Sequence, residues 1–154
     1  VTALMRACAN GYTPIVALLL EYGANVDLAD DAGYTALTLA VDEGYIEVAN
    51  MLITHGANVN HTDTDGRAAL WNSCGEGQTE MARLLLDQGA EVNHEDNYGV
   101  TALMRACHVG HMETVTLLLD QGANVNKVSK ANMTALDYAE VNQHTEVATM
   151  LRAR

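Results

Sequence analysis

The feature that most constrains the fold of this chain is an internal repeat of 33 residues. The tripeptide Thr-Ala-Leu, or Ala-Ala-Leu in one copy, begins at Thr2, Thr35, Ala68, Thr101 and Thr134. A mid-repeat glycine, a triplet of large apolar residues and a closing Gly-Ala pair recur at the same spacing without an insertion. Self-similarity at such a period is typical of arrays in which each unit buries its apolar face against the next. The sequence therefore predicts one elongated domain whose core runs along a line.

Within each unit, apolar residues fall at helical spacing. In the first unit Leu4, Ala7 and Cys8 share one face behind Thr2, a residue type that caps helix N-termini. Pro14 falls in the first turn of the second predicted helix, where its missing N–H costs no hydrogen bond. We therefore predict an all-α fold of five helix pairs joined by short turns, with no substantial sheet.

The unit resembles the ankyrin repeat, which consists of a turn, a helix beginning Thr-Pro-Leu-His, a Gly-His turn, a Leu-rich second helix and a Gly-Ala-Asp-Val-Asn exit. The regular unit here has Thr101-Ala-Leu-Met, Gly110-His, Leu117-Leu-Leu and Gly122-Ala-Asn-Val-Asn. The resemblance covers the whole chain. It implies an ankyrin repeat solenoid, in which helix-turn-helix units stack and their turns protrude.

Two positions depart from the family pattern in every unit. Alanine stands in place of the proline, which does not threaten a helix because alanine is the best helix former. The histidine of the motif is replaced in turn by Met5, Thr38, Trp71, Met104 and Asp137. We therefore expect the hydrogen bonds that the family's histidine makes near the turns to be missing.

A single domain over residues 1–154 is predicted, divided into five repeats. In chain order, repeats 1 to 5 are residues 1–29, 30–62, 63–95, 96–128 and 129–154. Repeat 1 starts short of its own turn glycine, so we expect the chain to be the C-terminal part of a longer array, with an exposed apolar end that promotes self-association. In repeat 5, Glu140 and Arg152 occupy positions that are mostly apolar elsewhere, as expected of a capping repeat.

Charge and hydropathy exclude several classes of protein. The net charge of −12 argues against nucleic-acid binding, which requires a basic face, and favours either a basic partner or simple solubility. No apolar run of about 18 residues indicates a membrane span. No charged-then-apolar leader opens the chain. We therefore predict a cytoplasmic or nuclear protein.

The sequence contains no arrangement that indicates catalysis, a cofactor or a metal. Three cysteines share one repeat position and are predicted to be buried thiols at least one repeat apart: Cys8, Cys74 and Cys107. His61 and His94 fall in equivalent loops, and His108 and His111 are separated by the Gly110 turn, so no zinc site is expected. No nucleophile stands beside a histidine, and no Gly-rich loop joins a strand to a helix. The chain is therefore predicted not to be an enzyme and not to bind a small-molecule substrate.

Repeat 3 departs most from the shared pattern. Ala68 replaces the capping Thr, Ser73 replaces a core Ala, and Trp71 and Asn72 replace aliphatic or long residues. Gly75 joins Gly77 around the end of the first helix. A lost cap and an interior glycine each cost about 1 kcal/mol. We predict that repeat 3 is the weak joint of the array, and that its irregularity reflects either function or drift.

Trp71 is the centre of the predicted binding site. It follows Leu70 of the buried face, so its ring is predicted to project to the concave side that the family resemblance implies. The predicted partner-binding residues are Asp31, Tyr34, Asp42, Glu43, Asp65, Trp71, Glu76, Tyr98, Met104 and Arg105. An aromatic centre with an acidic rim suits a partner segment with Arg or Lys beside apolar anchors. The alternative is a structural Trp71 that covers the base of adjacent turns.

The predicted function is a protein-binding module or scaffold with a rigid groove. The first alternative is a regulatory ankyrin segment of a larger enzyme, channel or pathogen effector, and the second is an engineered binder. The family resemblance also implies a modification site, because ankyrin repeats are substrates of an asparaginyl hydroxylase. Asn93, preceded by Glu91-Val and with Leu85 upstream, fits its preference. The alternative is that Asn93 only ties adjacent turns together.

Overall fold

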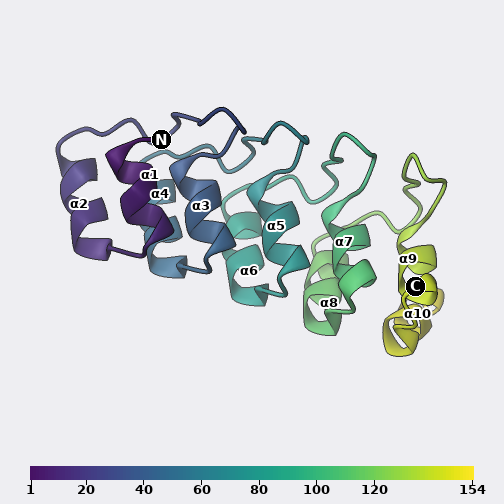
Figure 1. The fold of residues 1–154 in the computed structure, drawn as a ribbon. Helices are drawn as coiled ribbons and strands as arrows, with labels where there is room; N and C mark the ends of the chain where they lie inside the picture. The colour runs from purple at the N-terminus through teal and green to yellow at the C-terminus, as the bar shows by residue number, and fades with distance from the viewer.

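The computed structural model describes residues 1–154 and contains ten α-helices, two in each repeat (Figure 1). They are α1 (Ala3–Ala9), α2 (Thr13–Glu21), α3 (Ala36–Asp42), α4 (Ile46–Thr54), α5 (Ala69–Gly75), α6 (Thr79–Asp87), α7 (Ala102–Val109), α8 (Met112–Asp120), α9 (Ala135–Val141) and α10 (Thr145–Arg152). There is no strand, only isolated bridges at Thr62–Ala68 and Glu95–Thr101. The predicted all-α repeat solenoid is confirmed. None of its helices combines the length and the apolar character that a membrane span requires.

The helix pairs form two layers. The first helices of successive repeats contact one another along one layer, and the second helices do so along the other. In Figure 1 the pairs follow one another in a row, and the long connections between pairs all lie along one edge. Helices of this length are marginal on their own. Each is therefore stabilised mainly by packing against its partner helix and the adjacent repeats.

Four of the five first helices begin with a reciprocal capping box. In α7 the N–H of Met104 donates to Thr101 Oγ1 at 3.3 Å, and the N–H of Thr101 donates back to Met104 Sδ at 3.5 Å. Thr38 and Asp137 close the same box with an oxygen, at 2.7 Å each. The expectation that bonds near the turns would be missing is therefore wrong for these repeats, because sulfur, hydroxyl and carboxylate all accept a hydrogen bond.

Repeat 3 is the exception to this capping pattern. Ala68 occupies the N-cap of α5 and provides no side-chain hydrogen bond. The indole of Trp71, at the position that closes the box elsewhere, is a donor only and cannot accept the N–H of the capping residue. Both hydrogen bonds of the capping box are therefore absent from α5, because neither the Ala68 side chain nor the Trp71 side chain can accept an N–H from the backbone of the other residue.

The core is one continuous cluster along the array. The predicted buried face is confirmed in repeat 2, where Leu37, Ala40 and Val41 are at most 1% exposed. The three cysteines occupy the equivalent line and are free and buried. Burial raises the pKa of Cys8 to about 11 and those of Cys74 and Cys107 to about 12. These thiols stay protonated and act as small apolar side chains.

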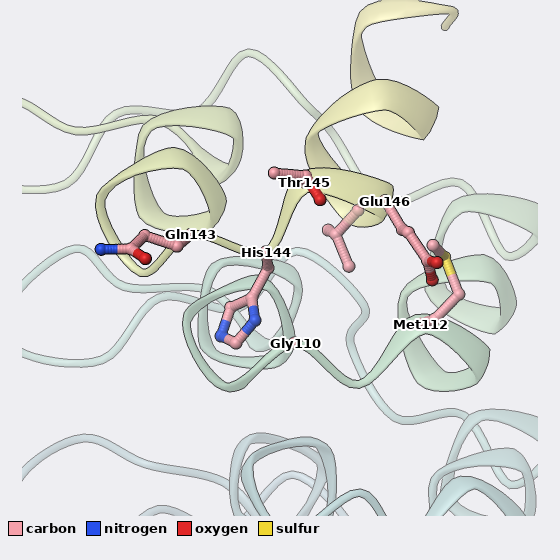
Figure 2. A pocket seen from close by; sticks show the side chains of 7 residues that line it. Gly110, Met112, Gln143, His144, Thr145 and Glu146 are labelled. Carbon is pink, nitrogen blue, oxygen red and sulfur yellow. The ribbon is translucent and has the colours of Figure 1, made fainter.

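The turn between the two helices of a repeat packs against the next repeat. Gly77 has a φ of 67°, and an added Cβ would lie 2.7 Å from the imidazole of His111. That ring contacts the Gly75 carbonyl oxygen through Nε2 at 3.2 Å. Figure 2 shows the same arrangement one repeat later, with His144 against the turn at Gly110. Glycine is required at these turns by both the backbone and the neighbouring ring.

The missing cap of α5 should be correctable. Ala68 has φ −91° and ψ 164°, close to the −90° and 166° of Thr101, so Ala68→Thr fits the existing backbone. We expect this change to stabilise the chain by about 1 kcal/mol and to slow hydrogen exchange of the α5 amides. The matched control, Thr101→Ala, should cost about 1 kcal/mol and accelerate exchange in α7. Slower exchange in α5 than in α3 and α7 of the unaltered chain would contradict the predicted weak joint.

Candidate functional site

The candidate site is centred on the side chain of Trp71, which is half-buried on the exposed side of the first-helix layer. Two guanidinium groups lie against its ring. Arg67, from the turn that precedes α5, has its Cζ 4.7 Å from the ring centroid, and Arg105, from α7 of the next repeat, has its Cζ at 4.9 Å. Each such contact contributes about 0.5–1 kcal/mol when exposed and about 2 when desolvated. Repeats 3 and 4 are therefore joined here by a cation–π cluster, called the Arg67–Trp71–Arg105 cluster below.

Gly75 makes room for this cluster. It lies in the last turn of α5 with ordinary helical backbone, so no turn requires a glycine there. An added Cβ would lie 2.6 Å from Arg105 Nε and 3.1 Å from its Cγ. The missing side chain lets Arg105 lie flat on α5 and reach the indole ring. The irregular Trp71 and Gly75 of repeat 3 thus share one structural reason.

Three N–H groups of the cluster are buried without a hydrogen-bond acceptor. They are Trp71 Nε1, Arg67 Nε and Arg105 Nε. Arg67 also forms an ion pair with Asp65 at 3.1 Å, whereas Arg105 is paired with no carboxylate. Buried donors are nearly always satisfied in folded proteins. Their concentration at one place distinguishes this part of the surface from the rest of the array.

Two hollows share the cluster as a common wall. The hollow on the repeat 2 side has a volume of 310 Å³, and its other lining residues are Tyr34, Asp42, Asn72 and Glu76. The hollow on the repeat 5 side has a volume of 260 Å³, and its other lining residues are Asp96, Tyr98, Val100, Met104, His108 and Tyr138. We call them the acidic hollow and the apolar hollow. Together with the cluster they form the Trp71 surface.

The acidic hollow holds its carboxylates close together. Asn72 donates from Nδ2 to Asp42 Oδ1 at 2.7 Å. Asp42 as a whole is exposed, but the atoms packed around its carboxyl group raise the pKa of that group. The hydrogen bond from Asn72 lowers this pKa, and the negative charges of Glu43 and Glu76 raise it. The negative potential at this end of the surface favours a cation.

Seven of the ten predicted residues line one or both hollows, namely Tyr34, Asp42, Trp71, Glu76, Tyr98, Met104 and Arg105. Asp31 and Glu43 are exposed outside them, and Asp65 holds Arg67. The prediction was wrong for Met104 as an exposed contact. It is 1% exposed because its side chain turns back to close the capping box.

Sequence reasoning missed Arg67, which lies at the centre of the surface. Arg67 is one 33-residue period after Tyr34, a predicted site residue. The same shift that defines the repeats could therefore have identified it. Asn72, the residue after Trp71 in α5, was also missed. The packing of repeats 4 and 5 brings four further missed residues to the apolar hollow, namely Asp96, Val100, His108 and Tyr138.

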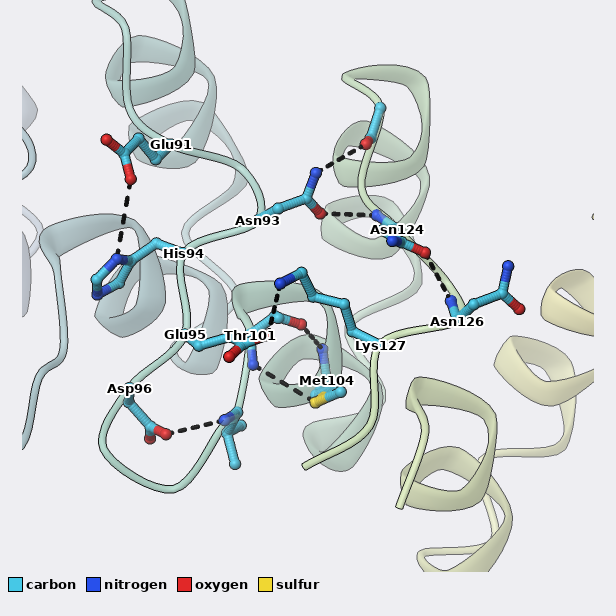
Figure 3. Close-up of polar contacts among 12 residues, drawn as sticks. Glu91, Asn93, His94, Glu95, Asp96, Thr101, Met104, Asn124, Asn126 and Lys127 are labelled. Atoms are coloured by element: carbon cyan, nitrogen blue, oxygen red, sulfur yellow. Dashed lines mark hydrogen bonds and ion pairs between the residues drawn. The ribbon is translucent and has the colours of Figure 1, made fainter. Parts of the chain in front are cut away.

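Asn93 lies in the connection between repeats 3 and 4 and ties two exits together. Its Nδ2 donates to the Gly122 carbonyl at 3.2 Å, and its Oδ1 accepts the N–H of Asn124 at 2.7 Å (Figure 3). Asn60 makes the equivalent pair of bonds to Gly89 and Glu91 one repeat earlier. Both polar atoms of Asn93 are thus engaged in the array, and its hydroxylation stays a prediction.

One family model matches the chain along its whole length. A family model described as "Ankyrin repeats (3 copies)" matches residues 1–63, 56–129 and 97–154. The three matches overlap, because a model of several repeats can align at more than one position along a periodic sequence. A search of curated proteins gave no match.

The fit between Gly75 and Arg105 can be tested by a double-mutant cycle. Gly75→Ala alone should gain little stability, because the helix-propensity gain of about 1 kcal/mol is offset by displacement of Arg105 from the indole. In an Arg105→Ala background the same change should stabilise by about 1 kcal/mol. Urea unfolding of the four proteins measures the coupling. Equal effects of Gly75→Ala in both backgrounds would show that Arg105 does not depend on the glycine.

Two carboxyl groups should respond to pH with opposite signs. The pKa of Asp42 is higher in the folded state than in the unfolded state, so its negative charge lowers the free energy of unfolding at any pH above the unfolded pKa. Asp42→Asn should therefore stabilise the chain at neutral pH, and this gain should fade as the pH falls. Hydrogen bonds from the backbone and side chain of Thr134 lower the pKa of Asp137. Asp137→Asn should therefore destabilise at neutral pH, with a loss that fades in acid as pH falls through the folded pKa. Unfolding free energies from neutral pH to about pH 3 compare the two, and shifts of the same sign would refute the assignment.

Proposed function

Because the chain belongs to the ankyrin repeat family, whose repeats are generally protein–protein interaction modules, we propose that it binds a protein partner through the Trp71 surface. The surface lies on the first-helix layer, which forms the concave groove of such a solenoid. The occupant is a basic, partly apolar segment. The single observation that carries the proposal is the Arg67–Trp71–Arg105 cluster between two hollows, because no other repeat contains such a feature.

The acidic hollow supplies the recognition of a basic residue. A lysine or arginine there meets the carboxylates of Asp42 and Glu76 beside the rings of Tyr34 and Trp71. Charge-assisted hydrogen bonds and contact with an aromatic face both favour such a cation. The net charge of −12 adds attraction at long range, which raises the association rate and makes it depend on salt. Asp31, Glu43 and Asp65 extend the acidic rim beyond the hollow.

This function is compatible with two settings for the chain. It is a scaffold in its own right, or the regulatory segment of a larger enzyme, channel or pathogen effector; ankyrin repeats are typically non-catalytic in either case. The free thiols of the core suit a reducing compartment such as the cytoplasm or the nucleus.

Self-association through repeat 1 is a second proposed interaction. Ile15 and Leu18 are 49% and 53% exposed, whereas the positions equivalent to Ile15 in repeats 2 and 3, Val48 and Met81, are 1% and 2% exposed. The apolar side chains that later repeats bury against a neighbour are thus uncovered on this face, which favours contact with another apolar surface.

The role of Trp71 can be tested with peptides selected from a displayed random library on the folded chain. Trp71→Ala should weaken their binding by about 2 kcal/mol or more, roughly thirtyfold, and binding should fade as salt rises. Tyr22→Ala, which removes an 82% exposed ring on repeat 1, is the matched control and should leave affinity unchanged. If Trp71→Ala instead lowers the melting temperature and binds normally while folded, Trp71 is structural and the proposal is wrong.

A further inference from the structure

The two hollows of the Trp71 surface differ in charge. The acidic hollow is lined by the carboxylates of Asp42 and Glu76 in addition to the two arginines of the shared wall. The apolar hollow has the same two arginines, but Asp96 is its only carboxylate. The apolar hollow is therefore more positive, although it is part of a strongly acidic protein.

The carboxylate of Asp96 is already engaged. Asp96 is 7% exposed, and its Oδ1 accepts the N–H groups of Tyr98 at 2.8 Å and Val100 at 2.9 Å. These hydrogen bonds stabilise the turn of repeat 4 and hold the carboxylate against the backbone of that turn. Asp96 forms no ion pair with either arginine of the hollow, and Arg67 is paired with Asp65 instead.

Arg105 is the guanidinium without a counter-charge. Arg67 has Asp65 as its ion-pair partner, while Arg105 contacts the indole ring and keeps a buried Nε without an acceptor. Gly75 leaves space for its stem, and the contact with the indole ring holds the guanidinium in place. A preorganised guanidinium binds a carboxylate with two parallel hydrogen bonds and little further loss of side-chain freedom.

We propose that the apolar hollow binds an acidic side chain, Asp or Glu, from the same partner segment whose basic residue occupies the acidic hollow. This inference rests on the proposed function and adds a second, oppositely charged subsite to it. Arg105 donates to the carboxylate, and the exposed ring of Tyr98 packs against the aliphatic part of that side chain. A partner segment is then fixed in direction, with its basic residue toward repeat 2 and its acidic residue toward repeats 4 and 5.

The surroundings favour a carboxylate over a phosphate group. Asp42 and Glu76 line the neighbouring hollow, and Asp65 is paired with Arg67, so three carboxylates already lie around the cluster. A phosphate carries nearly twice the charge of a carboxylate at neutral pH. A single carboxylate is matched by Arg105 alone.

Selection from a library of short displayed random peptides tests the two subsites separately. Peptides selected by the unaltered chain should be enriched in Lys or Arg and, at a fixed spacing, in Asp or Glu. Arg105→Gln should select peptides that keep the basic residue and lose the acidic one. Asp42→Asn combined with Glu76→Gln should do the reverse. The inference is overturned if the peptides selected by the unaltered chain need Trp71 for binding but contain no preferred Asp or Glu position. It is also overturned if the peptides selected by Arg105→Gln still contain that acidic position.

A synthetic peptide of the selected consensus gives the quantitative test. Replacing its acidic residue with the amide should weaken binding to the unaltered chain about tenfold, equivalent to about 1.4 kcal/mol, and should change binding to Arg105→Gln by less than about twofold. Trp71 is the only tryptophan of the chain, so its single indole N–H resonance reports both the fold of each variant and occupancy of the site. A consensus peptide with phosphoserine at the acidic position should bind more weakly, and tighter binding would overturn the choice of a carboxylate.

The outcomes separate this inference from the proposed function. If no peptide is selected, or if binders ignore Trp71→Ala, the Trp71 surface is not a binding site and both are wrong. If binders need Trp71 and the acidic hollow but tolerate Arg105→Gln with their acidic residue intact, only the second subsite is refuted.

Discussion

The structure depends on the lateral packing of each helix pair on its neighbours. Helices of seven to nine residues are not stable alone, and the capping boxes add only a modest stabilisation to each. The side chains that make the array stable, such as Val16, Val48 and Val115, are fully buried only because successive repeats close over them. Every repeat must therefore present two complementary apolar faces, and this requirement enforces the 33-residue period.

The same requirement determines where the repeats are free to differ. Positions that face a neighbouring repeat stay apolar or small, so variation is concentrated in the turns and on the exposed side of the first helices. The Trp71 surface is built there from four repeats, with Asp42 from repeat 2, Trp71 from repeat 3, Arg105 from repeat 4 and Tyr138 from repeat 5. A glycine that weakens α5 makes the contact with repeat 4 possible. The lower helix propensity of Gly75 is thus coupled to the contact between Arg105 of repeat 4 and the Trp71 ring of repeat 3.

Net charge and local charge differ in this protein. The chain has twenty acidic and eight basic residues, and the resulting field acts at long range. At the Trp71 surface, however, two of the basic residues converge on one aromatic ring. Within a few ångströms the nearest charges dominate the interaction, because salt and water screen the distant ones. In the proposed binding mode, this surface would distinguish the two ends of a bound segment, which an acidic groove alone would not do.

The sequence by itself determined the array, the helix positions, the buried face and most of the residues around Trp71, because these follow from a period and from helical spacing. It could also have identified Arg67, one period after Tyr34. The outward ring of Trp71 was predicted as well, but only the tertiary structure decided that Met104, at the equivalent position, turns inward. A thioether can accept the N–H of a capping threonine and an indole cannot, and no capping threonine precedes Trp71. Likewise, Arg105 reaches the indole of another repeat only because Gly75 leaves the space, a contact between residues 30 positions apart that no local pattern contains.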